Sequence, residues 1–195
     1  GEALLCFGDS DGDIDLTVSG GTLPYTYTWD NGAGTDEDPV GLTAGDYAVT
    51  VTDNNGCTIE RSASITEPTE LIAAATGEIL LCFGDSDGNI DLTVSGGSQP
   101  YTYIWDNGAG TDEDPVGLTA GDYAVTVTDN NGCTIERSAS ITEPAELVAT
   151  ATGEALLCFG DNDGDIDLTV SGGSQPYTYA WDNGAGTTED ITGLT

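Results

Sequence analysis

Residues 46–65 read DYAVTVTDNNGCTIERSASI and describe two strands joined by a tight turn. Tyr47, Val49 and Val51 alternate with small or polar residues, which is the pattern of a strand with one buried face. The sequence DNNG at 53–56 follows, and Asn-Gly tolerates positive φ at both central positions of a hairpin turn. Residues 57–65 return as the next strand. The stretch therefore predicts a β-hairpin.

The segments before and after this hairpin extend the pattern. Residues 13–19 and 24–29 alternate apolar and polar side chains, and a Gly-Gly pair at 20–21 separates them. Residues 71–82 supply a further strand. Short strands interrupted by Gly, Asn and Asp about every ten residues predict an all-β chain made of immunoglobulin-like β-sandwiches.

The aromatic residues of 24–29 fall on one strand face. Tyr25, Tyr27 and Trp29 alternate with threonines, so the favoured interpretation is core packing. The alternative is a surface platform on which sugar rings stack. The predicted core aromatics of the chain are Trp29, Trp105 and Trp181.

The whole pattern repeats with a period of 76 residues. GEALLCFGD begins at Gly1, GEILLCFGD at Gly77, and GEALLCFGD again at Gly153. Such a period is longer than that of a solenoid repeat and suits a small independent domain. Proline cannot donate to a sheet ladder, so Glu-Pro at 67–68 and 143–144 marks the seams. The predicted modules are 1–68, 69–144 and 145–195, of which the second is complete, the first lacks its opening strand and the third lacks its last two strands.

The charge of the chain excludes several classes of protein. There are 35 Asp and Glu, two Arg and neither Lys nor His, which gives a net charge of −33. Without a basic patch the chain is not expected to bind nucleic acid or an anionic membrane. Its composition is nevertheless 37% hydrophobic, in organised runs that acidic disordered tails lack. No apolar run is long enough for a transmembrane helix.

The same composition predicts that the chain is not an enzyme. His and Lys, which serve as general bases and amine nucleophiles, are absent. Carboxylate pairs that would suit a glycosidase recur in every module, whereas a catalytic site is normally one constellation in one cleft.

An acidic loop follows the first cysteine of each module. Closely spaced Asp residues around a Gly can supply the hard oxygen ligands that calcium prefers. The alternative is a solvated acidic turn, because the Gly does not stand where it does in an EF-hand loop. The candidate calcium ligands are Asp9, Asp11, Asp13, Asp15, Asp85, Asp87, Asn89, Asp91, Asp161, Asp163, Asp165 and Asp167.

Four motifs occur in a fixed order: CFGDSDG at 6–12, VSGG-x-x-PYTY-x-W at 18–29, GLTAGDY at 41–47 and VTDNNGC at 51–57. Together they resemble the SprB repeat, found in long surface adhesins of gliding and biofilm-forming Bacteroidota, and parts also resemble PKD modules. The resemblance covers essentially the whole chain. It implies an outer-surface protein exported by the type IX system, and it implies no particular ligand.

The five cysteines are Cys6, Cys57, Cys82, Cys133 and Cys158. The first and second cysteine of a module are 51 residues apart, which predicts disulfides Cys6–Cys57 and Cys82–Cys133. The partner of Cys158 would stand 51 residues later, outside this sequence. A bridge across the seam, Cys57–Cys82, is the alternative. Zinc is not favoured, since the chain has no His and no Cys-x-x-Cys pair.

Two functions remain after these exclusions. The first is a structural stalk or filament of an extracellular adhesin, at the cell surface or secreted, with roles in adhesion, gliding or biofilm. The second is a repetitive module that binds carbohydrate or a calcium-bridged partner. The expected partners are other modules of the array, lateral copies in a fibre, and surface glycans.

Overall fold

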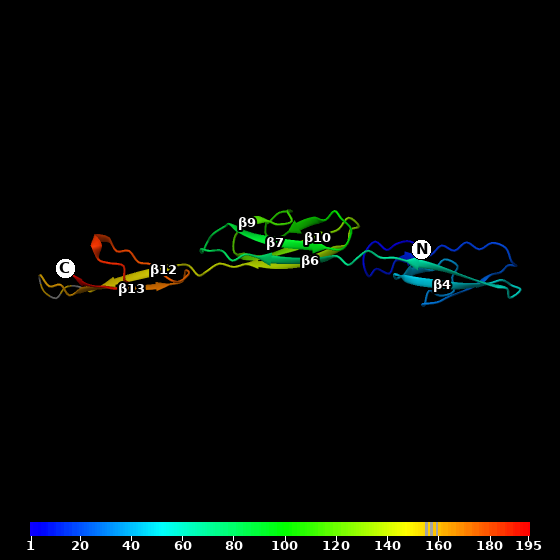
Figure 1. The fold of residues 1–195 in the computed structure, drawn as a ribbon, viewed down its shortest axis with the longest axis horizontal. Coiled ribbons are helices and arrows are strands. Elements are labelled where there is room, and N and C mark those ends of the chain that lie inside the picture. The colour runs from blue at the N-terminus through cyan, green and yellow to red at the C-terminus, as the bar shows by residue number, and fades with distance from the viewer. Residues whose placement is uncertain (155, 157, 159) are drawn as a thin grey trace.

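The computed structural model describes residues 1–154, 156, 158 and 160–195. Three β-modules follow one another in a row (Figure 1). One 3-10 turn, η1 (Asp182–Gly184), is the one helical element of the described residues. No helix in that part of the chain is long and apolar enough to cross a membrane.

The middle module is a complete two-sheet sandwich. Its first sheet has the order β6-β7-β9 and its second the order β8-β10-β11, all antiparallel. The strands are β6 (Ile72–Gly77), β7 (Gly88–Ser95), β8 (Thr102–Trp105), β9 (Val116–Leu118), β10 (Gly121–Thr128) and β11 (Thr134–Ile141). This order matches the A-B-E and C-F-G sheets of an immunoglobulin constant-type domain. The fold class expected from the sequence is confirmed.

Alternating residues of both sheets meet in the core of this module. Ile90, Val125 and Val127 are the most deeply buried side chains, each at most 1% exposed. Burying side chains of this size contributes about 1.5–3 kcal/mol each. Trp105 lies in the same cluster, and its indole N–H donates to the Asp112 carbonyl at 2.9 Å, so the one polar atom of the ring is satisfied.

A tyrosine fixes the entry into β10. The hydroxyl of Tyr123 donates to the carbonyl of Thr119 at 3.0 Å, four residues upstream. Tyr47 makes the same contact with Thr43 in the first module. Immunoglobulin-like sandwiches carry such a tyrosine near the start of strand F. The sequence pattern assigned Tyr47 to a buried strand face but gave no sign of this hydrogen bond.

The first module has the same plan with one difference. Its sheets are β1-β3 and β2-β4-β5. The strands are β1 (Gly12–Asp13), β2 (Thr26–Trp29), β3 (Val40–Leu42), β4 (Gly45–Thr52) and β5 (Thr58–Ile65). The strand predicted over 13–19 is wrong for most of its length here, whereas its counterpart β7 is a full strand. The reason is the missing ladder partner: residues 90–95 of β7 pair with β6, and no segment of the first module takes that place.

The third module consists of one sheet among the described residues. Its order is β12-β13-β14, with β12 (Val148–Gly153), β13 (Gly164–Ser171) and β14 (Ile191–Leu194). The tyrosine-rich segment before Trp181 is not a strand, because it lacks a neighbour like β10. The seams predicted at 67–68 and 143–144 fall between strands, in the stretches that link β5 to β6 and β11 to β12.

Candidate functional site at the seam between modules

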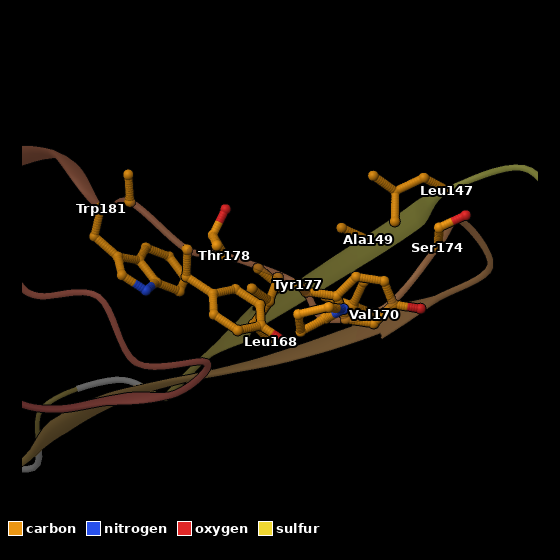
Figure 2. Close-up of a pocket in the computed structure, with 12 residues that line it drawn as sticks. Leu147, Ala149, Leu168, Val170, Ser174, Tyr177, Thr178 and Trp181 are labelled. Carbon is orange, nitrogen blue, oxygen red and sulfur yellow. The ribbon is translucent and has the colours of Figure 1, made fainter. Parts of the chain in front are cut away.

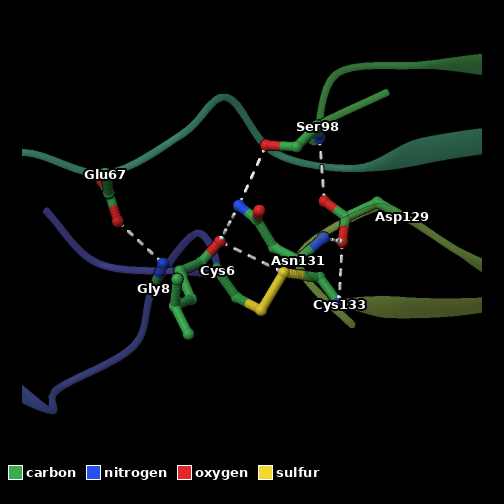
Figure 3. The surroundings of a disulfide bond; sticks show 8 residues. Cys6, Gly8, Glu67, Ser98, Asp129, Asn131 and Cys133 are labelled. Atoms are coloured by element: carbon green, nitrogen blue, oxygen red, sulfur yellow. Dashed lines mark hydrogen bonds between the residues drawn. A yellow bond between two sulfur atoms is a disulfide. The ribbon is translucent and has the colours of Figure 1, made fainter. Parts of the chain in front are cut away.

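The first seam is closed by a covalent bond. Cys6 of the first module forms a disulfide with Cys133 of the middle module, with a Cα–Cα distance of 5.6 Å and a sequence separation of 127 residues (Figure 3). Cys57, Cys82 and Cys158 are free and exposed. The bridge joins the chain across the seam rather than within a sandwich.

The pairings Cys6–Cys57 and Cys82–Cys133 expected from the spacing are therefore wrong, and so is the alternative Cys57–Cys82. Cys57 immediately precedes β5, whereas Cys6 lies beside the residues that follow β5. An eight-residue strand is about 26 Å long. A disulfide requires Cα atoms within about 7 Å, so two cysteines at opposite ends of one sandwich cannot pair. Head-to-tail stacking brings the first cysteine of one module to the second cysteine of the next.

The turn that carries Cys133 is organised by one carboxylate. Asp129 is 5% exposed and accepts hydrogen bonds from the backbone N–H groups of Ser98 at 2.8 Å and of Asn131 and Cys133 at 2.9 Å. Burial acts to raise the pKa of Asp129, but these hydrogen bonds outweigh it and leave the pKa below its usual range. The turn that presents Cys133 is thus held by these hydrogen bonds and does not depend on the disulfide.

The first module contains the same turn. Asp53 accepts from the N–H groups of Cys57 and Asn55 at 2.9 Å and of Thr22 at 3.0 Å. The hydrogen bond from Cys57 is the largest cause of its lowered pKa. The arrangement around Cys57 is therefore ready to present a cysteine, although Cys57 itself is free.

One side chain extends the turn across the seam. The Asn131 Nδ2 donates to the carbonyl of Leu5 in the first module at 2.8 Å, and also to the Ser98 hydroxyl at 2.9 Å. Asn55 makes the corresponding contact with the Thr22 hydroxyl at 2.9 Å inside the first module. Asn131 therefore ties the Cys6 loop to the middle module beside the disulfide.

The loop that carries Cys6 is held by its own module. The N–H of Gly8 donates to the Glu67 carboxylate at 2.7 Å, and the N–H of Leu4 donates to the Thr66 carbonyl at 2.8 Å. Gly84 with Glu143 and Leu80 with Thr142 repeat these contacts at the same distances. The first and second copies thus each anchor their first cysteine to the residues of their own seam.

The seam buries little apolar surface. Leu5 remains 58% exposed beside the middle module, compared with 82% for its counterpart Leu81. A cavity of about 460 Å³ lies next to the bridge, lined in part by Cys6, Phe7 and Cys133. The covalent bond and the Asn131 hydrogen bond, rather than a packed interface, hold the two modules in register.

The acidic loops do not converge on one point. In the middle module Asn89 and Asp91 lie along the extended strand β7, and Asp85 accepts from the N–H of Cys82 at 3.2 Å. Among the described residues no three His, Cys, Asp or Glu side chains are grouped to hold a metal ion. Asn89 Oδ1 and Asp165 Oδ1 are buried without a hydrogen-bond partner, but one oxygen falls far short of the six to eight that calcium takes. The described side chains, as the structure places them, do not form a calcium cage. Calcium binding therefore stays a prediction from the sequence alone.

The predicted core aromatics are placed unequally. Trp29 and Trp105 are buried in their sandwiches, whereas Trp181 is half-buried. Trp181 lines a cavity of about 480 Å³ together with Leu147 and Ala149 (Figure 2). Their counterparts in the middle module, which include Ala73, are covered core residues. The cavity is therefore the core face of the third sheet and not a ligand pocket.

Sequence reasoning missed the residues that build the seam. The DNNGC motif predicts a turn, but the motif also supplies the carboxylate, the amide and the thiol of a docking loop. The recurrence of Asn two residues before the cysteine was the available signal. The sequence pattern indicates only that Glu67 and Glu143 mark the module boundary.

The fold and the seam define a class of protein: a tandem array of immunoglobulin-like modules joined head to tail. The SprB repeat family model matches residues 4–34, 80–110 and 150–186, which together are just over half of the chain. The chain belongs to the SprB repeat family, a family of cell-surface adhesin repeats. It is accordingly a repetitive, adhesin-like structural module.

The solved structures that match the chain include immunoglobulin arrays. A three-immunoglobulin structure of titin domains is 13% identical with a TM-score of 0.41, covering 100% of this chain and 85% of that one. The N-terminal four Ig domains of Dscam1 isoform 9.44 are 15% identical with a TM-score of 0.30, and the match spans 73% of this chain and 43% of theirs. Sidekick-1 immunoglobulin domains 1–4 are 13% identical with a TM-score of 0.33, covering 88% and 56%. No curated protein matches the chain.

Proposed function

We propose that this chain is a segment of a stalk or filament in an extracellular surface adhesin. The observation that carries the proposal is the closed first seam: six residues and a disulfide join the first sandwich to the middle one, and the three modules follow one another in a row. Disulfides persist outside the reducing cytosol, which agrees with a location at the cell surface or in the secreted fraction. Export by the type IX system and roles in adhesion, gliding or biofilm belong to the same proposal.

The heavy negative charge supports a stalk. A net charge of −33 keeps arrays apart and soluble, and the strand faces that carry the tryptophans point into the sandwiches. The partners that the seam would bind are other modules of the same array. The alternative function, a module that binds glycans or a calcium-bridged partner, finds no cluster of exposed tryptophans in the two sandwiches that have both sheets.

Small-angle scattering and a glycan-binding assay test the stalk. A compact domain of this length would have a radius of gyration of about 16 Å. We expect a value well above that, independent of protein concentration, and no saturable binding of the chain to a panel of immobilised glycans. A compact particle would contradict the stalk, and saturable glycan binding would favour the alternative.

A further inference from the structure

We infer that the seam disulfide is the tension-bearing link of the array, so that a pull along the chain passes through Cys6 and Cys133 and bypasses the residues between them. The inference rests on the proposed stalk, because it says how such a stalk would resist force. The bridge closes a loop of 127 residues, which includes most of the first module and most of the middle one. Two modules that unfold inside this loop cannot lengthen the chain beyond the bridge.

The direction of the bridge gives it this role. Cys6 lies near the start of the first module and Cys133 near the end of the middle module, so the two cysteines enclose most of both hydrophobic cores. The buried core residues outside the loop are Leu4, Ala139 and Ile141. A bridge within one module would enclose one core, and the seam would then be spanned by the six-residue linker and its noncovalent contacts alone. Beside the bridge, Asn131 donates a hydrogen bond across the seam to the Leu5 carbonyl, and the Leu5 side chain stays largely exposed.

Two of the free cysteines, Cys57 and Cys82, occupy positions equivalent to the two cysteines of the seam disulfide. Cys57 stands in the turn built by Asp53, as Cys133 stands in the turn built by Asp129. Cys82 stands in the loop anchored by Glu143, as Cys6 stands in the loop anchored by Glu67. Translation by one repeat places Cys82 opposite the second cysteine of the third copy, and Cys57 opposite the first cysteine of any copy that precedes Gly1.

Bridges repeated in this way interlock. The loop closed by Cys6 and Cys133 overlaps the loop that a bridge from Cys82 would close. The bridge from Cys158 would begin a third loop, and only the 25 residues from Cys133 to Cys158 separate that loop from the first. In a longer array of this repeat, about one residue in six would bear tension. Each bridge forms when two thiols lose two protons and two electrons to an oxidising disulfide, which leaves as two thiols.

Single-molecule stretching of the 195-residue chain between thiol-free tags at its two ends tests the inference. An extended chain spans up to about 3.6 Å per residue, so the reduced chain reaches about 700 Å. With the seam bridge intact we expect a fully extended length that is shorter by about 460 Å. Two bridges within modules would shorten it by about 370 Å, and a Cys57–Cys82 bridge by about 90 Å.

Matched variants separate the bridge from general stability. Cys133→Ser removes the bridge and should give the reduced length under oxidising conditions. Cys57→Ser changes the equivalent cysteine of the preceding copy and should keep the short length. Equal lengths for the oxidised and reduced chain, or a shortening near 370 or 90 Å, would overturn the inference. None of these outcomes changes the radius of gyration or the result of the glycan-binding assay. Those two measurements therefore test the proposed stalk separately from the disulfide.

Discussion

The carboxylate of Asp129 is the residue on which the docking turn depends. Its Oδ1 accepts from Asn131 and Cys133, and its Oδ2 accepts from Ser98. Asp129→Asn preserves shape but turns an amide donor toward the Ser98 N–H. Leaving buried polar groups unpaired costs about 1–3 kcal/mol, so we expect the middle module to lose that much unfolding free energy in denaturant titrations at pH 7.

The pH dependence of the same variant gives the control. The pKa of Asp129 is lowered on folding, so its stabilisation is fully present above a pH of about 3.8 and is lost as pH falls through the folded pKa. The difference between wild type and Asp129→Asn should therefore shrink below that pH. Asp53→Asn alters the half-buried copy of the turn and should cost less. A gap that stays constant down to pH 2 would contradict this role.

At the level of the strands, the sequence predicted what side-chain alternation specifies and missed what depends on a partner strand. The hairpin predicted over 46–65 exists as β4 and β5, because both strands and their turn are contiguous. The strand predicted over 13–19 reaches full length only where a strand like β6 pairs with it, as in β7. The cysteine pairing failed for a related reason: spacing along the chain does not say at which end of a sandwich a residue lies.

Grafting the missing partner tests this explanation. Residues 69–76, placed directly before Gly1, supply a copy of β6 to the first module. We expect the amide protons of 14–19 to become as slow to exchange as those of β7, because the ladder hydrogen bonds then form. A graft with Ala73→Asp, which puts a charge at a buried position, is the control. Unchanged exchange in the graft would show that another constraint keeps this segment irregular.

At the scale of the whole molecule, folding brings many like negative charges close together. With 35 acidic residues and two arginines, compaction is opposed by repulsion that salt screens. We expect the unfolding midpoint to rise with ionic strength. Calcium and magnesium, compared at matched ionic strength, should raise it equally, because the described residues group no three carboxylates for a metal. A rise specific to calcium at submillimolar concentration would instead establish the calcium site predicted from the acidic loops.

The row of modules depends on which cysteines pair, and the two arginines allow that to be read directly. Trypsin cleaves after Arg61 and Arg137, so the denatured chain, alkylated but not reduced, yields fragments 1–61, 62–137 and 138–195. We predict that fragments 1–61 and 62–137 remain joined through Cys6 and Cys133, in wild type and in Cys57→Ser, and separate in Cys6→Ser. Free fragments, each with an internal disulfide, would show that bridges form within modules and would contradict the head-to-tail seam.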